Sequence, residues 1–168
     1  DSPRMATQSY ADMASDLAEV IGTLAGPVDL LGHSMGGKAA MQLALTSPDL
    51  VRRLIVADIA PVAYTHDQTT RAEADAALGQ TVTDPALRAF FLQSLDFRMK
   101  PPRWKLNLPV LEAEMPKIVG WPDTCGTFDH PTLFLTGAES PYVRPEHREA
   151  IRALFPKARF VRIPGAGH

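Results

Sequence analysis

The chain has 168 residues, a length that fits one ordinary domain with a buried apolar core. Hydrophobic residues make up 45% and charged residues 21%, so the composition excludes a disordered chain and predicts a globular protein. The net charge of -2 leaves no basic surface of the kind that nucleic-acid binding requires, and no apolar stretch is long enough to span a membrane.

The cysteine content and the start of the chain add further expectations. The single cysteine, Cys125, cannot form an internal disulfide, and no cluster of cysteine and histidine predicts a metal site. We therefore expect a soluble protein of a reducing compartment such as the cytoplasm, without a metal and with the oligomeric state left open. The chain starts with DSPRM and not with an initiator methionine, which predicts that it begins inside a longer protein.

The first part of the chain predicts a helix, a strand and a second helix in succession. A capping pair, Ser9 and Asp12, precedes a helical pattern of apolar residues. The apolar run 28–31 is too short for a helix and predicts a buried strand. The segment 36–47 is dense in strong helix formers and ends before a proline, which predicts the second helix.

Strand patterns return twice more along the chain. The run 54–57 predicts a strand that a helical crossover joins to the first one, as in parallel sheets. A later strand is expected at 132–137, followed by a helix near 145–155 and a last strand at 159–163. The predicted fold class is therefore α/β, a mostly parallel sheet with flanking helices.

The segment between these two halves has a different character. Residues 65–128 are polar and rich in alanine, and they predict roughly three short helices without intervening strands. We interpret this segment as a helical cap or lid inserted into a core that is built from residues 1–64 and 129–168.

The loop after the first predicted strand carries the strongest chemical signal. Gly32-His33-Ser34-Met35-Gly36 matches the pattern G-x-S-x-G, a nucleophile elbow that lifts a serine hydroxyl above the sheet. We expect both glycines to allow close approach of neighbouring backbone, and the Met35 N–H to stabilise an oxyanion. Because the motif lies between a predicted strand and a predicted helix, as this elbow requires, Ser34 is the predicted nucleophile.

The same loop nearly matches a second motif. Residues 32–39, GHSMGGKA, are one residue short of the phosphate-binding pattern G-x-x-x-x-G-K-[ST]. Because Ala39 has no hydroxyl to hold magnesium, we favour the elbow over a nucleotide site. Lys38 is then expected to be a solvated helix residue.

A serine nucleophile needs a histidine base, and the chain offers five histidines. His168 follows the last predicted strand and a glycine loop, which displays a side chain at the carboxyl edge of a sheet, so we predict it as the base. The side chain of His33 is expected to point away from that of Ser34. The others are interpreted as surface or packing residues: His66, His130 and His147.

Two carboxylates compete for the role of orienting this histidine. Asp58 directly follows a predicted strand, and no charged neighbour explains it as a purely structural residue. Glu139 follows the strand 132–137, where the acid of such a site usually lies, but it stands one residue before the expected position, which Ser140 occupies. We favour Asp58 and keep Glu139 as the alternative acid.

Four segments together carry a family resemblance: GHSMGGKAAMQLAL, ADIAPV, HPTLFLTGAESPYV and the final PGAGH. They resemble small α/β-hydrolase esterases of bacteria and the related abhydrolase-domain proteins of mitochondria. The resemblance implies an α/β-hydrolase fold and cofactor-free hydrolysis of acyl esters, sometimes thioesters, through an acyl-serine intermediate. It assigns the nucleophile to Ser34, the base to His168 and, in at least some members, the acid to Asp58.

The same resemblance sets the limits of this interpretation. Family members have further strands before the part that matches this chain and a helix after the histidine, so we expect a chain truncated at both ends. The expected partner is a small acyl ester. Hydrolysis of carbon–carbon bonds, acyl transfer and a catalytically silent fold are the alternatives.

Overall fold

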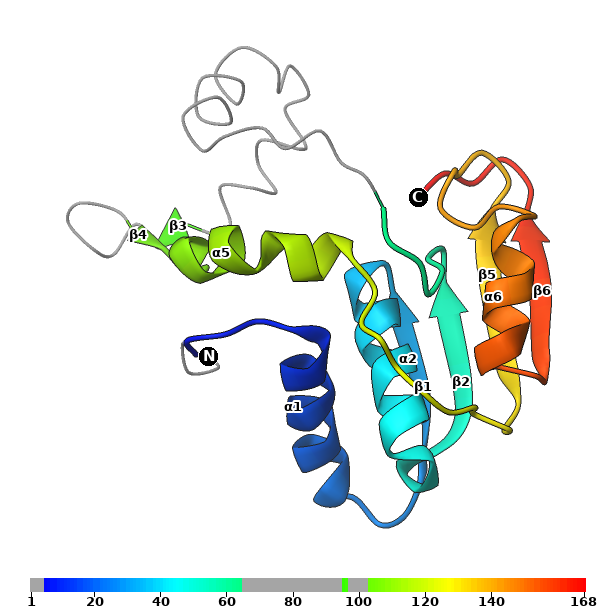
Figure 1. Cartoon of the computed structure of the whole chain (residues 1–168), viewed down its shortest axis with the longest axis horizontal. Helices are drawn as coiled ribbons and strands as arrows, with labels where there is room; N and C mark the ends of the chain where they lie inside the picture. Colours follow the sequence, from blue (N-terminus) through cyan, green and yellow to red (C-terminus); the bar gives the residue numbers. More distant parts are fainter. Residues whose placement is uncertain (1–4, 65–94, 97–102) are drawn as a thin grey trace. The chain divides into compact units, whose positions relative to one another are not determined.

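The computed structural model of the protein describes residues 5–64, 95–96 and 103–168 (Figure 1). The chain divides into two compact units. The larger one holds residues 7–64 and 114–168, and the smaller one holds residues 1–6 and 65–113.

The larger unit is built on a sheet of four parallel strands, which confirms the predicted fold class. In sheet order the strands are β1 (Val28–His33), β2 (Val51–Ala57), β5 (Thr132–Gly137) and β6 (Ala158–Ile163). β2 begins earlier than predicted because Val51 pairs with Val28 of the neighbouring strand. Since all four strands run the same way, the loops that follow them gather at one edge of the sheet.

The helices of the larger unit confirm the predicted order of elements. They are α1 (Tyr10–Gly22), α2 (Met35–Thr46), a short 3-10 helix η1 (Pro48–Leu50) and α6 (His147–Leu154). Ser9 and Asp12 form the predicted capping box at the start of α1. Figure 1 shows α2 and α6 on the same side of the sheet, as two right-handed crossovers between neighbouring parallel strands require. No helix in the described part of the chain is long and apolar enough to cross a lipid bilayer.

The apolar core lies between these helices and the sheet. Val56 of β2 and Phe134 of β5 are completely buried, and so are Met41 of α2 and Phe155 after α6. The ring of Phe134 packs edge-on against that of Phe155 at a centroid distance of 5.9 Å. This core fixes the central strands, whose carboxyl ends carry the site described below.

The first strand differs from its prediction. We expected a buried strand, but alternate residues of β1 are exposed, and Leu31 is 62% exposed. The physical reason is that α2 packs against one face of β1. Because side chains of a strand alternate between its two faces, every second side chain of β1 points away from this helix.

The smaller unit contains a pair of short strands. β3 (Leu95–Asp96) and β4 (Arg103–Trp104) pair in antiparallel orientation, so the prediction of a cap without strands is wrong at these residues. Two-residue strands are too short to produce a detectable alternation in the sequence. α5 (Leu108–Val119) begins in this unit, ends in the larger one and confirms a helix predicted there. The helices predicted between residues 65 and 94 lie outside the described residues, so the cap at 65–128 stays a prediction.

Candidate active site

The turn between β1 and α2 holds Ser34 in a strained conformation. Its φ is 53° and its ψ is -126°, a region that residues with a side chain rarely adopt. The Ser34 N–H donates to the carbonyl of Ala57 at 3.1 Å, and the Ser34 carbonyl accepts from the N–H groups of Gly37 and Lys38. The turn is thus fixed to both β2 and α2, which compensates for the strain.

Two glycines make this turn sterically possible, and the sequence predicted this role for only one of them. A Cβ atom on Gly32 would overlap the backbone of Gly36 and Gly37, so this position confirms the expected close approach. A Cβ atom on Gly36 would meet nothing within 4 Å, and the expectation is wrong there. Gly37 has that role instead, because a Cβ atom on it would lie 2.6 Å from a methyl group of Ile59.

His168 joins Ser34 and Asp58 in one chain of hydrogen bonds. Its Nε2 lies 2.9 Å from the Ser34 Oγ, and its Nδ1 lies 2.7 Å from the Asp58 Oδ2. The Asp58 side chain is only 8% exposed, whereas that of His168 is 33% exposed. Ser34 follows β1, Asp58 follows β2, and His168 comes after β6. The parallel sheet thus brings together at its carboxyl edge the three positions that the sequence singled out.

Asp58 is held by the loops around it. Its Oδ1 accepts a hydrogen bond from the Gly137 N–H at 3.1 Å, and its Oδ2 accepts one from the Ser140 hydroxyl at 2.5 Å. Its backbone has a φ of 53°, and its N–H donates to the Leu135 carbonyl at 2.7 Å. Asp58 and Ser34 are the two non-glycine residues with positive φ in the described part of the chain. Backbone strain of this kind gathers at functional sites.

The other candidate acid occupies a different place. Glu139 is exposed, its N–H donates to the Ala166 carbonyl at 2.9 Å, and its carboxylate is not among the described contacts of His168. Ser140 stands at the position where we expected an aspartate. Its hydroxyl donates a hydrogen bond to the Asp58 carboxylate. Sequence reasoning missed this contact, because a lone serine after a strand is ordinarily a turn residue.

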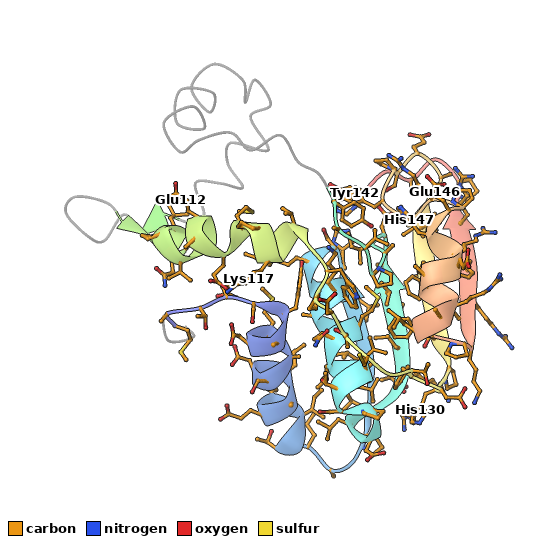
Figure 2. The ribbon with its side chains drawn as sticks, in the orientation of Figure 1. Glu112, Lys117, His130, Tyr142, Glu146 and His147 are labelled. Carbon is orange, nitrogen blue, oxygen red and sulfur yellow. The ribbon has the colours of Figure 1, made fainter. Side chains whose placement is uncertain are left out.

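Two aromatic rings flank the imidazole of His168. The Tyr142 ring lies at a centroid distance of 4.0 Å and the His33 ring at 4.8 Å, both tilted relative to the imidazole. The His33 Nε2 also lies 3.1 Å from the carbonyl oxygen of His168. The carbonyl oxygen of Tyr142 lies 3.2 Å from the Nδ1 of His147, which Figure 2 shows beside it. Neither neighbour of His168 was identified from the sequence, because both contacts join distant parts of the chain.

Lys38 departs most from its prediction. We expected a solvated side chain, but Lys38 is 1% exposed, and its Nζ donates to the carbonyls of Val119 and Gly120 at 3.2 and 2.5 Å. Burial lowers the pKa of this ammonium to about 8. Because protein carbonyls already accept from an enclosed Lys38, it is not presented to a phosphate group, which weighs further against a nucleotide site.

The start of α2 offers a donor to a developing negative charge. The first N–H groups of a helix have no acceptor within the helix, and the Met35 N–H donates to no backbone acceptor in the described residues. The helix terminus also carries a partial positive charge. Met35 therefore stays a candidate oxyanion donor beside Ser34.

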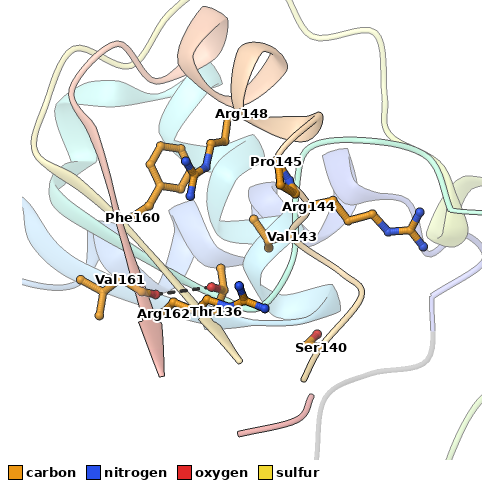
Figure 3. A pocket seen from close by; sticks show the side chains of 9 residues that line it. All are labelled: Thr136, Ser140, Val143, Arg144, Pro145, Arg148, Phe160, Val161 and Arg162. Atoms are coloured by element: carbon orange, nitrogen blue, oxygen red, sulfur yellow. Dashed lines mark hydrogen bonds between the residues drawn. The ribbon is translucent and has the colours of Figure 1, made fainter. Parts of the chain in front are cut away.

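A separate hollow of about 230 Å³ borders the site at Ser140, the residue that donates to Asp58 (Figure 3). Its walls come from β5, β6 and the start of α6, and Ser140 is part of them. The Arg148 guanidinium lies over the Phe160 ring at 5.1 Å, whereas Arg144 extends away from both. Ser34 is not among the described residues that line this hollow. Within the same part of the chain, no three His, Cys, Asp or Glu side chains gather as metal ligands would.

Comparisons with known proteins extend the resemblance over the whole chain. Residues 1–168 match the model of the Alpha/beta hydrolase family. The chain is 39% identical over 191 residues to the sn-1-specific diacylglycerol lipase ABHD11 of Mus musculus, and 37% identical over 186 residues to esterase YbfF of Escherichia coli strain K12. A solved structure of a marine microorganism esterase matches with a TM-score of 0.86 and 34% identity, covering 99% of this chain and 73% of that one.

These relatives are longer than the chain. The matches cover 100% and 99% of this chain, but 62% of the mouse protein and 70% of the bacterial one. The chain thus spans less than two thirds of the length of its mouse relative. Within that span, the family match and the parallel sheet agree with the resemblance that the motifs carry. The chain belongs to the α/β-hydrolase family.

Proposed function

We propose that the chain carries the site of a serine hydrolase that cleaves carboxylic esters through an acyl-serine intermediate. The observation that carries this proposal is the continuous chain of hydrogen bonds from the Ser34 Oγ through His168 to Asp58. The relatives named as a lipase and an esterase support an ester as the bond that is cleaved.

The proposed reaction begins with proton transfer from Ser34 to His168. As the Ser34 Oγ attacks the acyl carbonyl carbon, the His168 Nε2 accepts its proton. This requires the other ring proton to sit on Nδ1, where the Asp58 carboxylate accepts its hydrogen bond and stabilises the imidazolium that forms. The imidazolium then donates its proton to the departing alkoxide oxygen. The products of this half are an acyl-Ser34 ester and an alcohol.

Water completes the cycle by the same route. His168 accepts a proton from the water that attacks the acyl-Ser34 carbonyl, and then returns it to the Ser34 Oγ as the carboxylic acid leaves. In both halves the carbonyl oxygen becomes negative, and the Met35 N–H at the start of α2 would stabilise it. Loss of one such donor commonly costs about a hundredfold or more in rate.

Hydrolysis of p-nitrophenyl esters of graded acyl length tests this proposal. The assay compares the wild type with Ser34→Ala, in this chain and in a form extended to the length of its relatives. Ser47→Ala is the matched control, since Ser47 lies at the far end of the same helix. We expect Ser34→Ala to abolish turnover and Ser47→Ala to keep it. Equal turnover in Ser34→Ala and the wild type would refute a serine mechanism at this site.

A further inference from the structure

His33 contacts the proposed base from the side of the nucleophile turn. It ends β1 and immediately precedes Ser34, and its Nε2 lies 3.1 Å from the carbonyl oxygen of His168. The two imidazole rings are 4.8 Å apart between their centroids. Because a carbonyl oxygen can only accept a hydrogen bond, the His33 Nε2 must carry a proton and donate it. The proposed mechanism gives this hydrogen bond no role.

The loop that carries His168 has few attachments of its own. The Ala166 carbonyl accepts a hydrogen bond from the Glu139 N–H at 2.9 Å. Beyond Ala166, the contact with His33 is the one hydrogen bond that the main chain of His168 makes to another described residue. The intervening Gly167 has no side chain that would restrict its backbone. The main-chain position of the proposed base therefore depends on His33.

Two adjacent residues thus hold two different parts of His168. The Ser34 Oγ lies 2.9 Å from its ring Nε2, and His33 binds its carbonyl. In the acyl-serine intermediate the Ser34 Oγ has no proton left to donate, so the first of these links is lost in the middle of the cycle. The contacts of His168 with His33 and Asp58 do not involve that proton. They can hold the imidazole in place while it accepts a proton from the attacking water.

We infer that His33 is a positioning residue that holds the main chain of His168 within reach of Ser34 and of the water that ends the cycle. Where it concerns activity, this inference rests on the proposed serine hydrolase. His33 exchanges no proton with the substrate. Its role requires only a hydrogen-bond donor at the position of its Nε2, and this requirement separates the side chains that can replace it from those that cannot.

Four variants test that requirement. His33→Leu removes the donor, His33→Gln returns an amide N–H at about the position of the imidazole Nε2, and His33→Asn has an amide too short to reach it. His130→Leu is the matched control, because the His130 Nδ1 lies 2.8 Å from the Val51 carbonyl and so forms the same kind of contact. Figure 2 shows His130 at the end of the sheet opposite Tyr142.

Nuclear magnetic resonance relaxation measures the attachment without any assay of activity. In the wild type we expect backbone order parameters near 0.85 for Gly167 and His168, the value of about 0.85 that rigid backbone gives. His33→Leu should lower both to about 0.6 or less, and His33→Gln should restore them. His130→Leu should match the wild type. The measurement is made on this chain and on the form extended to the length of its relatives.

Kinetics then test the consequence for the reaction. We expect His33→Leu to lower kcat for p-nitrophenyl acetate by about tenfold or more with KM within about twofold, because a small misplacement of a catalytic group slows the chemical step. His33→Gln should stay within about threefold of the wild type, and His130→Leu within about twofold. His33→Asn should behave as His33→Leu does. Since it keeps a polar side chain, it serves as the test where His33→Leu does not fold.

The outcomes separate this inference from the proposed function. Equal losses of kcat in His33→Leu and His33→Gln, or no loss in either, would overturn the positioning role. A raised KM with an unchanged kcat would also overturn it, because His33 would then act on substrate binding. If the wild type hydrolyses no ester while the order parameters fall in His33→Leu and recover in His33→Gln, the proposed function fails and the attachment of His168 by His33 stands.

Discussion

Two polar side chains, one in the turn before α2 and one in the first turn of that helix, have opposite surroundings. Ser34 lies half-buried in a strained turn and contacts a partly exposed histidine. Lys38 lies in regular helix, is 1% exposed, and its Nζ donates to two carbonyl oxygens and lies over two tyrosine rings. The comparison teaches that the side chain we propose as reactive has a strained backbone and access to solvent, whereas the buried one in regular helix links two distant segments by hydrogen bonds.

The largest expected effect concerns Asp58, the proposed acid. Asp58→Asn would remove the carboxylate that orients His168, and we expect kcat for ester hydrolysis to fall by about 10⁴. Glu139→Gln is the matched control, and we expect it to stay within about twofold of the wild type, because its exposed carboxylate is not among the described contacts of His168. A larger loss in Glu139→Gln than in Asp58→Asn would reverse the assignment of the acid.

The turn itself gives the next largest effect, on stability. Gly32→Ala would force a Cβ atom into the backbone of Gly36 and Gly37, and we expect it to lower the free energy of unfolding by about 3 kcal/mol or more. Gly36→Ala has open space around its Cβ atom and should change this free energy by less than about 1 kcal/mol. Denaturant unfolding of both variants checks the contrast, and equal losses would contradict the described packing of the turn.

Burial of Lys38 predicts a pH dependence of stability. Its pKa is about 8 in the folded chain and about 10.4 in the unfolded one, so between these values only the unfolded chain keeps the proton. The free energy of unfolding should therefore rise with pH in this window, by at most about 1.4 kcal/mol per pH unit. Tyr10 and Tyr64 face the ammonium, and burial raises the pKa of each to about 12, so they oppose this trend only above about pH 10.

Denaturant unfolding between about pH 7 and about pH 9.5 tests that slope. We expect Lys38→Met to lose the rise that the wild type shows, and the exposed Lys117→Met to keep it. Identical slopes in the wild type and Lys38→Met would show that Lys38 titrates as an ordinary solvated lysine.

The smallest expected effect concerns the Tyr142 ring beside His168, the proposed base. The Tyr142 ring lies on the His168 imidazole, where its face would stabilise the imidazolium by about 0.5 to 1 kcal/mol. Tyr142→Leu should thus lower kcat by about two- to fivefold, and Tyr142→Phe, which keeps the ring, should match the wild type. Equal losses in both variants would point to the hydroxyl and not to the ring face.

These contrasts also explain which parts of the molecule could be predicted from the sequence. The G-x-S-x-G turn is local, since the glycines, the strand before Ser34 and the helix after it lie within one short segment. Asp58 and His168 were found because each follows a strand, and parallel strands bring such positions to one edge. Local patterns and the parallel sheet were therefore sufficient for the three candidate residues.

The features that escaped prediction depend on contacts between distant segments. Lys38 looks like a solvated residue in its own helix, and only the carbonyls of Val119 and Gly120, some eighty residues later, explain its burial. Ser140 has an ordinary turn sequence, and its role depends on Asp58 from another strand. No periodicity within a single segment reports such pairings.

The most direct test of the central claim is mass spectrometry of the protein after reaction with a fluorophosphonate probe, which bonds covalently to activated serines. We predict one adduct on the peptide that contains Ser34, its loss in Ser34→Ala, and strongly slowed labelling in Asp58→Asn. The test is run on this chain and on a form extended to the length of its relatives. Labelling of a different residue, or none on Ser34 in either form, would contradict the account.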